Sequence, residues 1–161
     1  MGEKSHLIER YEKAWVFFGL GMIVVFLILI GYLMVAHGQT NPVGAGRVDV
    51  ATVRTEGQFA NPRIERVGNE YVAYIQAFAF SFLPAEMRVT AGRRVTFYVT
   101  SPDVMHSFTI VGTNINMQVI PGEIGKVSHT FDEPGEYLII CNEYCGIAHA
   151  NMISRIIVEP N

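Results

Sequence analysis

The stretch "RRVTFYVTS" (residues 93–101) alternates between apolar and polar side chains. In an extended chain Val95, Phe97 and Val99 fall on one face, and the threonines and the tyrosine between them fall on the other. Because successive side chains of a β-strand point to opposite faces, this alternation predicts a strand with one face turned toward a core.

Similar short segments, rich in β-branched and aromatic residues, occur on both sides of this stretch. They are "EYVAYIQAFAF" (70–80), "FTIVG" (108–112), "INMQVI" (115–120), "KVSHTF" (126–131), "EYLIIC" (136–141) and "SRIIVEP" (154–160). Gly, Pro and Asp residues that favour turns separate these segments, and no second helical pattern accompanies them. Roughly seven strands at intervals of about ten residues predict a mainly β fold, a small sandwich or barrel.

The N-terminal part has a different pattern. The segment "AWVFFGLGMIVVFLILIGYLMVA" (14–36) contains no charged residue. As a helix it would rise about 34 Å, which is enough to cross a hydrocarbon core roughly 30 Å thick. Its apolar run is also far longer than the 7–15 residues typical of a cleaved signal peptide. We therefore predict one uncleaved transmembrane helix.

These patterns divide the chain of 161 residues into four parts. They are a short tail (1–13), the transmembrane helix (14–37), a linker that leads into the domain (38–69) and a β domain (70–161). Gly19, Gly21 and Gly31 would let another membrane helix approach closely. The net charge of −3 falls in the C-terminal part. It excludes a nucleic-acid-binding protein and is compatible with a mildly acidic docking surface.

Near the C-terminus, "CNEYCGIAHANM" (141–152) holds four potential metal donors with the spacing C-x3-C-x3-H-x2-M. Thiolate, imidazole and thioether donors together favour copper over magnesium, calcium or manganese. A mononuclear blue-copper site needs two His, one Cys and a weak axial Met. Cys145, His149 and Met152 match this loop, and His106 in "SPDVMHSF" (101–108) would supply the second imidazole.

Cys141 is not needed by a mononuclear site. Two thiolates four residues apart can instead bridge two copper ions, each of which then needs one imidazole and one weak donor. The chain offers enough groups for that arrangement, namely His106, His149, Met152 and the main-chain carbonyl of Glu143. A membrane-anchored mononuclear electron carrier and a binuclear site are both compatible with the donors.

Four further interpretations are less favoured. A disulfide between Cys141 and Cys145 is reasonable in an exported domain, but it leaves the nearby histidines and Met152 unexplained. A structural zinc site would not use Met152 and more often contains a C-x2-C pair. In a thioredoxin-like copper chaperone the cysteines precede a helix, whereas here they follow a predicted strand. A copper-delivery or metal-sensing domain would need to exchange copper reversibly.

Together, "SPDVMHSF" and "CNEYCGIAHANM" resemble the binuclear copper (CuA) domain of subunit II of haem–copper cytochrome c oxidases. The resemblance runs from about residue 70 to the end of the chain, and it implies a cupredoxin-like Greek-key β-sandwich with one N-terminal transmembrane helix. It also implies two copper ions per chain, with Glu143 binding through its main-chain carbonyl. The implied side-chain ligands are His106, Cys141, Cys145, His149 and Met152.

A single transmembrane helix is similar to the B-type bacterial and archaeal branch of the family. The segment "AFAFSFLP" (77–84) also resembles an aromatic stretch of that branch, which makes Phe78 and Phe80 candidates for the surface where electrons enter. In many members the side chain of the residue matching Glu143 helps to bind magnesium at the interface with subunit I.

The resemblance implies that the chain is the subunit of a terminal respiratory oxidase through which electrons enter. The copper site would accept electrons from cytochrome c and pass them to a haem in subunit I. There oxygen is reduced to water and protons are pumped, so no residue of this chain would be catalytic. The resemblance further implies a prokaryotic cell membrane, with a cytoplasmic N-terminus, lipid around the helix and the copper domain on the outer, periplasmic face.

Overall fold

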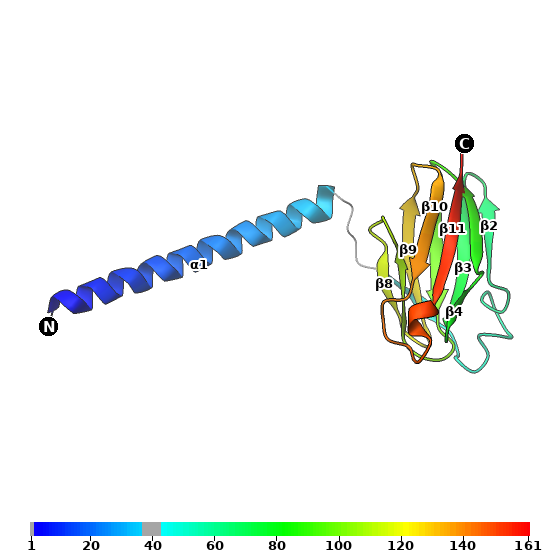
Figure 1. Cartoon of the computed structure of the whole chain (residues 1–161), viewed down its shortest axis with the longest axis horizontal. Coiled ribbons are helices and arrows are strands. Elements are labelled where there is room, and N and C mark those ends of the chain that lie inside the picture. The colour runs from blue at the N-terminus through cyan, green and yellow to red at the C-terminus, as the bar shows by residue number, and fades with distance from the viewer. Residues whose placement is uncertain (1, 37–42) are drawn as a thin grey trace. The chain divides into compact units, whose positions relative to one another are not determined.

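A computed structural model describes residues 2–36 and 43–161 of the protein (Figure 1). The end of the predicted transmembrane segment and the start of the predicted linker, residues 37–42, lie outside the described residues. The chain forms two compact units, residues 1–40 and 41–161, and each is described by itself.

The first unit is one helix, α1 (Gly2–Ala36). It contains a stretch, Ile8–Ala36, that is long and apolar enough to cross a membrane. α1 begins before the predicted membrane segment. The charged residues that the sequence assigned to a separate tail therefore form the first turns of the helix. This extension contains the i,i+4 pair Glu9–Lys13, whose side chains lie 2.7 Å apart and favour a helix. The predicted N-terminal helix is therefore present and longer than expected.

The second unit consists of two β-sheets. The first sheet has the order β1 (Val43–Arg47), β9 (Glu123–Thr130), β6 (Arg94–Thr100), β3 (Glu70–Phe78) and β2 (Arg63–Val67), with β4 (Ser81–Leu83) paired to β3. The second has the order β5 (Glu86–Thr90), β11 (Ile153–Glu159), β10 (Gly135–Ile140), β7 (His106–Ile110) and β8 (Asn116–Val119). A short 3₁₀ turn, His149–Asn151, precedes β11.

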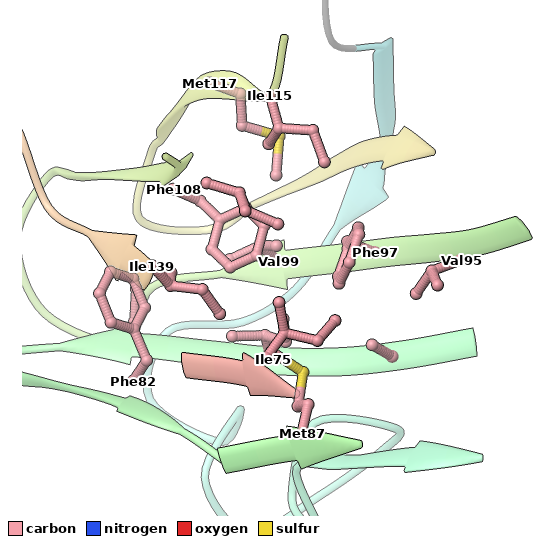
Figure 2. Close-up of a cluster of buried hydrophobic side chains, with 14 of the residues drawn as sticks. Ile75, Phe82, Met87, Val95, Phe97, Val99, Phe108, Ile115, Met117 and Ile139 are labelled. Atoms are coloured by element: carbon pink, nitrogen blue, oxygen red, sulfur yellow. The ribbon is translucent and has the colours of Figure 1, made fainter. Parts of the chain in front are cut away.

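The core lies between the two sheets. The alternation in β6 is confirmed, because Val95, Phe97 and Val99 are completely buried there. Figure 2 shows Phe97 and the aromatic ring of Phe108 among the buried side chains of this cluster. Phe108 belongs to β7 of the second sheet, and its ring centroid lies 5.4 Å from that of Phe97. The predicted mainly β sandwich is thus confirmed, with aromatic contacts that join its two layers.

The domain begins earlier in the chain than the β pattern indicated. β1 and β2 lie in the segment that was assigned to the linker leading into the domain, and β1 pairs with β9. β1, "VGAGR", joins the sheet through backbone pairing with β9, and its described side chains, residues 44–47, are exposed. β2, "RIERV", is an edge strand with no fully buried side chain.

The connection from β1 to β2 folds onto the first sheet. Its side chains Val53 and Phe59 are buried. The buried amide of Gln76 in β3 donates to the carbonyl oxygens of Phe59, at 2.5 Å, and of Val53, at 3.4 Å. This segment, residues 48–62, is the loop segment referred to below, and its backbone is fixed to β3 by the Gln76 side chain.

Candidate metal centre

Two loops meet at one end of the sandwich. His106 is the first residue of β7, and Cys141 directly follows the last residue of β10. β7 and β10 are antiparallel neighbours, which brings the start of one strand to the same edge as the end of the other. The loop from β6 to β7 and the loop from β10 to β11 therefore lie side by side.

The thiol of Cys141 lies among three other potential donors. Its Sγ atom is 3.9 Å from Nδ1 of His106, 4.0 Å from Sγ of Cys145 and 3.2 Å from the main-chain oxygen of Glu143. The donor atoms of His106, Cys141 and Cys145 all lie within 4.8 Å of one another. His106 and Cys141, which are 35 positions apart in the sequence, are thus close enough to bind the same metal centre.

The thiol of Cys145 completes the cluster. Its Sγ atom is 3.5 Å from Nδ1 of His149 and 3.7 Å from Sδ of Met152. The structure therefore brings together all six groups that the sequence singled out as ligands. His106 and Met152 are fully buried, whereas His149 is only partly buried.

The two cysteines are free thiols in a buried setting. Their sulfur atoms are 4.0 Å apart, against about 2.05 Å in a disulfide, so the chain holds them in position without a covalent bond. Burial, and after it the neighbouring Cys141, raises the pKa of the Cys145 thiol to about 11. A metal that binds the Cys145 thiolate must therefore displace a proton at neutral pH.

Asp103 orients the imidazole of His106. One carboxylate oxygen, Oδ1, lies 2.9 Å from Nε2 of His106, which leaves Nδ1 facing the thiol of Cys141. Burial by itself would raise the pKa of Asp103, but hydrogen bonds from the Ala79 N–H, from His106 and from the Val104 N–H lower it below its ordinary value. An ionised carboxylate behind a ligating histidine fixes its tautomer and makes it a better donor.

Sequence reasoning did not select Asp103 as a site residue, although it lies within "SPDVMHSF". Its position three residues before His106 was the available signal, since carboxylates commonly support ligating histidines. Ser107 was missed as well. Its buried hydroxyl accepts a hydrogen bond from the N–H of Asn142 at 2.6 Å, which fixes the residue after Cys141 to β7.

The aromatic candidates lie beside the same loops. Phe78 is the last residue of β3, and Phe80 follows in the turn to β4 and packs on the core cluster. A Cβ atom added to Gly146 would lie 2.8 Å from the ring of Phe80, and Gly146 also has a φ angle of +133°. A glycine after Cys145 therefore allows the metal loop to pass closely over the ring of Phe80.

The residues present fit copper. Two thiols, two imidazoles and a thioether are soft or borderline donors, and a single backbone oxygen completes the set. The carboxylate of Glu143 stands apart from this cluster, 3.4 Å from the amide nitrogen of Gln118 in β8. A β-sandwich with this buried donor cluster, preceded by a helix of membrane length, is typical of a membrane-anchored copper protein.

Comparison with known proteins shows which family of membrane-anchored copper proteins the chain resembles. The family "Cytochrome C oxidase subunit II, periplasmic domain" matches residues 73–160. The chain is 45% identical over 163 aligned residues to cytochrome c oxidase subunit 2 of Thermus thermophilus, covering 97% of this chain and 96% of that relative. The chain belongs to the cytochrome c oxidase subunit II family.

Solved structures agree with this assignment. A chain in the cryo-EM structure of a heme-copper terminal oxidase dimer superimposes with a TM-score of 0.72 at 28% identity, covering 92% of this chain and 99% of that one. The periplasmic domain of subunit II of cytochrome oxidase from Bradyrhizobium japonicum matches with a TM-score of 0.53 at 18% identity, covering 62% of this chain and 89% of that one, and supports the cupredoxin-like fold alone.

The expected role follows from family membership. The chain is the subunit through which electrons enter a haem–copper oxidase, an oxidoreductase complex. The family implies copper, and the complex implies the haem-bearing subunit I as a partner. One described helix of membrane length agrees with a single-pass anchor.

Proposed function

We propose that the donor cluster binds two copper ions as a CuA centre. The observation that carries this proposal is the position of Cys141, whose sulfur faces both Cys145 and His106 at about the same distance, 4.0 and 3.9 Å. A mononuclear site would have no use for a second buried thiol at this point. The proposed ligands are the side chains of His106, Cys141, Cys145, His149 and Met152 and the main-chain carbonyl of Glu143.

The residues of the chain serve to hold the ligands in one geometry. His106 and Cys141 extend from paired strands, and the buried Met152 immediately precedes β11. Asp103 restrains the His106 ring, and Ser107 restrains the backbone after Cys141. When bound, the copper pair supplies a centre that takes up and releases one electron at a time. Rigid ligands suit this task because electron transfer then needs little rearrangement.

We further propose that cytochrome c is the electron donor and docks over the partly buried His149. Tyr144 and Ile147 in the same loop are 80% and 97% exposed and offer an apolar contact surface beside it. Phe78 and Phe80 extend the candidate surface from the β3–β4 side. Electrons would then pass to a haem of subunit I, where oxygen is reduced to water and protons are pumped.

The arrangement in the cell follows from the same proposal. The chain would lie in a prokaryotic cell membrane, with lipid around α1, its N-terminus in the cytoplasm and the copper domain on the periplasmic face. The side-chain carboxylate of Glu143 is partly exposed and would be able to contribute to a magnesium site at the interface with subunit I.

Copper quantitation with electron paramagnetic resonance tests the binuclear centre. The full chain in detergent is expected to bind two copper ions, with hyperfine splitting from two copper nuclei. Cys141→Ser is expected to lose this spectrum, whereas Met105→Leu is a matched control because it removes an exposed thioether beside His106. One copper per chain, with an unchanged spectrum in Cys141→Ser, would show a mononuclear carrier instead.

The docking proposal has its own test. The rate of reduction by reduced cytochrome c is expected to fall several-fold in Ile147→Ser, while the copper spectrum stays unchanged. Leu138→Ser is the control, because Leu138 is an exposed apolar residue in the middle of β10, away from the metal loop. Equal rates in both variants would place the docking surface elsewhere.

A further inference from the structure

Arg54 lies directly behind the carboxylate that supports His106. Its guanidinium is 3.9 Å from Oδ2 of Asp103 and 5.2 Å from the centroid of the Phe78 ring. Arg54 belongs to the loop segment 48–62, outside the part of the chain that the subunit II family matches. The loop segment thus places a positively charged guanidinium next to Asp103, the residue that contacts the candidate copper ligand His106.

The position of Arg54 is built into the fold. The preceding residue, Val53, is 3% exposed, and its N–H donates to the carbonyl of Asp49 at 2.9 Å. The carbonyl of Val53 in turn lies 3.4 Å from the buried amide nitrogen of Gln76. The backbone on which Arg54 stands is therefore anchored to β3, and the arginine projects from a fixed point rather than from a free loop.

The carboxylate of Asp103 connects three parts of the site. Oδ1 faces Nε2 of His106 and also accepts the N–H of Val104 at 2.7 Å. Oδ2 accepts the N–H of Ala79 at 2.8 Å and faces Arg54. Any force that shifts this carboxylate therefore acts on the His106 ring and on the turn between Phe78 and Phe80 at once.

We propose that Arg54 is a positioning residue of the copper centre, which holds the Asp103 carboxylate against His106 and so keeps Nδ1 directed at Cys141. The proposal rests on the proposed function in one respect, that His106 is a ligand. Without Arg54 the carboxylate is held less firmly and the hydrogen bond from Nε2 to it weakens, which makes the imidazole a weaker donor. A weaker donor stabilises the oxidised metal less, so the midpoint potential rises.

The size of the effect is limited by solvent. The side chain of Arg54 is 55% exposed and that of Asp103 is 26% exposed, so water and salt screen the pair. We expect Arg54→Gln to change the electron-exchange equilibrium with a fixed redox partner by about threefold. At 59 mV per tenfold change for one electron, this corresponds to a midpoint potential higher by roughly 30 mV.

The first experiment measures the midpoint potential of the full chain in detergent, loaded with copper. Arg54→Gln is expected to raise it, and Arg54→Lys, which keeps the charge, is expected to retain most of the original value. Arg66→Gln is the matched control, because Arg66 is an exposed arginine of β2 whose guanidinium bonds the carbonyl of Gly68. A shift in Arg54→Gln no larger than that in Arg66→Gln would overturn the proposal.

A double-mutant cycle separates positioning from a direct effect of charge. If Arg54 acts through Asp103, Arg54→Gln has no further effect on the potential in an Asp103→Asn background. A full shift that persists in this background would mean that Arg54 acts on the metal through space, and the positioning role would be wrong.

A measurement without copper keeps this inference distinct from the binuclear proposal. In the copper-free full chain, Arg54→Gln is expected to speed hydrogen exchange at the Ala79 amide several-fold and to mix the tautomers of His106 seen by ¹⁵N NMR. Unchanged exchange and an unchanged tautomer would overturn the inference. A wild-type chain that binds one copper would instead overturn the binuclear centre. Circular dichroism establishes folding, and Arg54→Ala serves as the test should Arg54→Gln unfold.

Discussion

At the scale of single residues, the side-chain hydroxyl of Ser107 stabilises the backbone next to Cys141. It is buried, and its oxygen accepts the N–H of Asn142. Ser107→Ala leaves that N–H without its partner, so the free energy of unfolding is expected to fall by about 1–3 kcal/mol. Urea denaturation of the copper-free chain measures the change.

Ser81→Ala is the matched control for Ser107→Ala. Ser81 is partly buried, and its hydroxyl has only a long contact of 3.4 Å to the carbonyl of Phe82. The control is expected to change the free energy of unfolding by less than about 1 kcal/mol. If both variants lost equal stability, the hydrogen bond to Asn142 would not be the cause.

In the proposed centre, Cys145 makes copper binding depend on pH. Burial raises the pKa of its thiol to about 11, so the thiol is protonated at neutral pH and the metal must displace that proton. Below pH 11 the apparent affinity for copper is therefore expected to fall as the pH falls, by about tenfold per pH unit for each proton released. Competition against a chelator of known proton affinity, between pH 6 and 8, measures this slope. A corrected affinity that stays constant over the range would contradict it.

At the scale of elements, the loop segment 48–62 is held by two buried apolar side chains. Phe59 is the larger of these, and its ring lies 5.9 Å from that of Tyr74 in β3. Phe59→Ala removes this packing and is expected to lower the free energy of unfolding by about 3–5 kcal/mol. Thermal and urea denaturation of the full chain measure the loss.

Val67→Ala provides the comparison for Phe59→Ala, since Val67 is an exposed apolar residue at the end of β2. Surface substitutions of this kind usually change stability by no more than about 0.5 kcal/mol. A similarly small effect of Phe59→Ala would mean that the loop segment is not part of the cooperative fold. The anchored position of Arg54 would then lose its support.

At the scale of the whole molecule, the β unit contains its own core and the helix contains the membrane-length segment. We therefore expect residues 41–161, expressed alone, to be soluble, folded and able to bind copper, whereas the full chain partitions into the membrane fraction. Fractionation with copper analysis of both forms measures this. A truncated chain that stays with the membranes would show a second membrane contact on the β unit.

Sequence reasoning was most informative where the deciding pattern is local. The apolar run of α1 and the alternation of Val95, Phe97 and Val99 report directly on which faces avoid water. The spacing of Cys141, Cys145, His149 and Met152 was equally informative, because these residues lie in one short loop.

Reasoning from local pattern missed the strands β1, β2, β4 and β5. β1 is bound by backbone hydrogen bonds to β9, and β4 has three residues, too few to show a period. β5 does alternate, with Met87 and Val89 buried, but it is short and contains Glu86 and Arg88. Backbone pairing leaves little trace in side-chain periodicity.

By itself, the sequence determined a membrane-length helix and a mainly β domain, because burial imposes a period on neighbouring residues. It also supplied a set of candidate copper donors, because most of these lie in one short loop. Only the tertiary structure decided which distant groups meet. The parallel pairings of β3 with β6 and of β5 with β11 are examples. The approach of Arg54 to Asp103 and of Asp103 to His106 is another. Such contacts depend on how separate strands and loops pack together, and no local pattern in the chain records that packing.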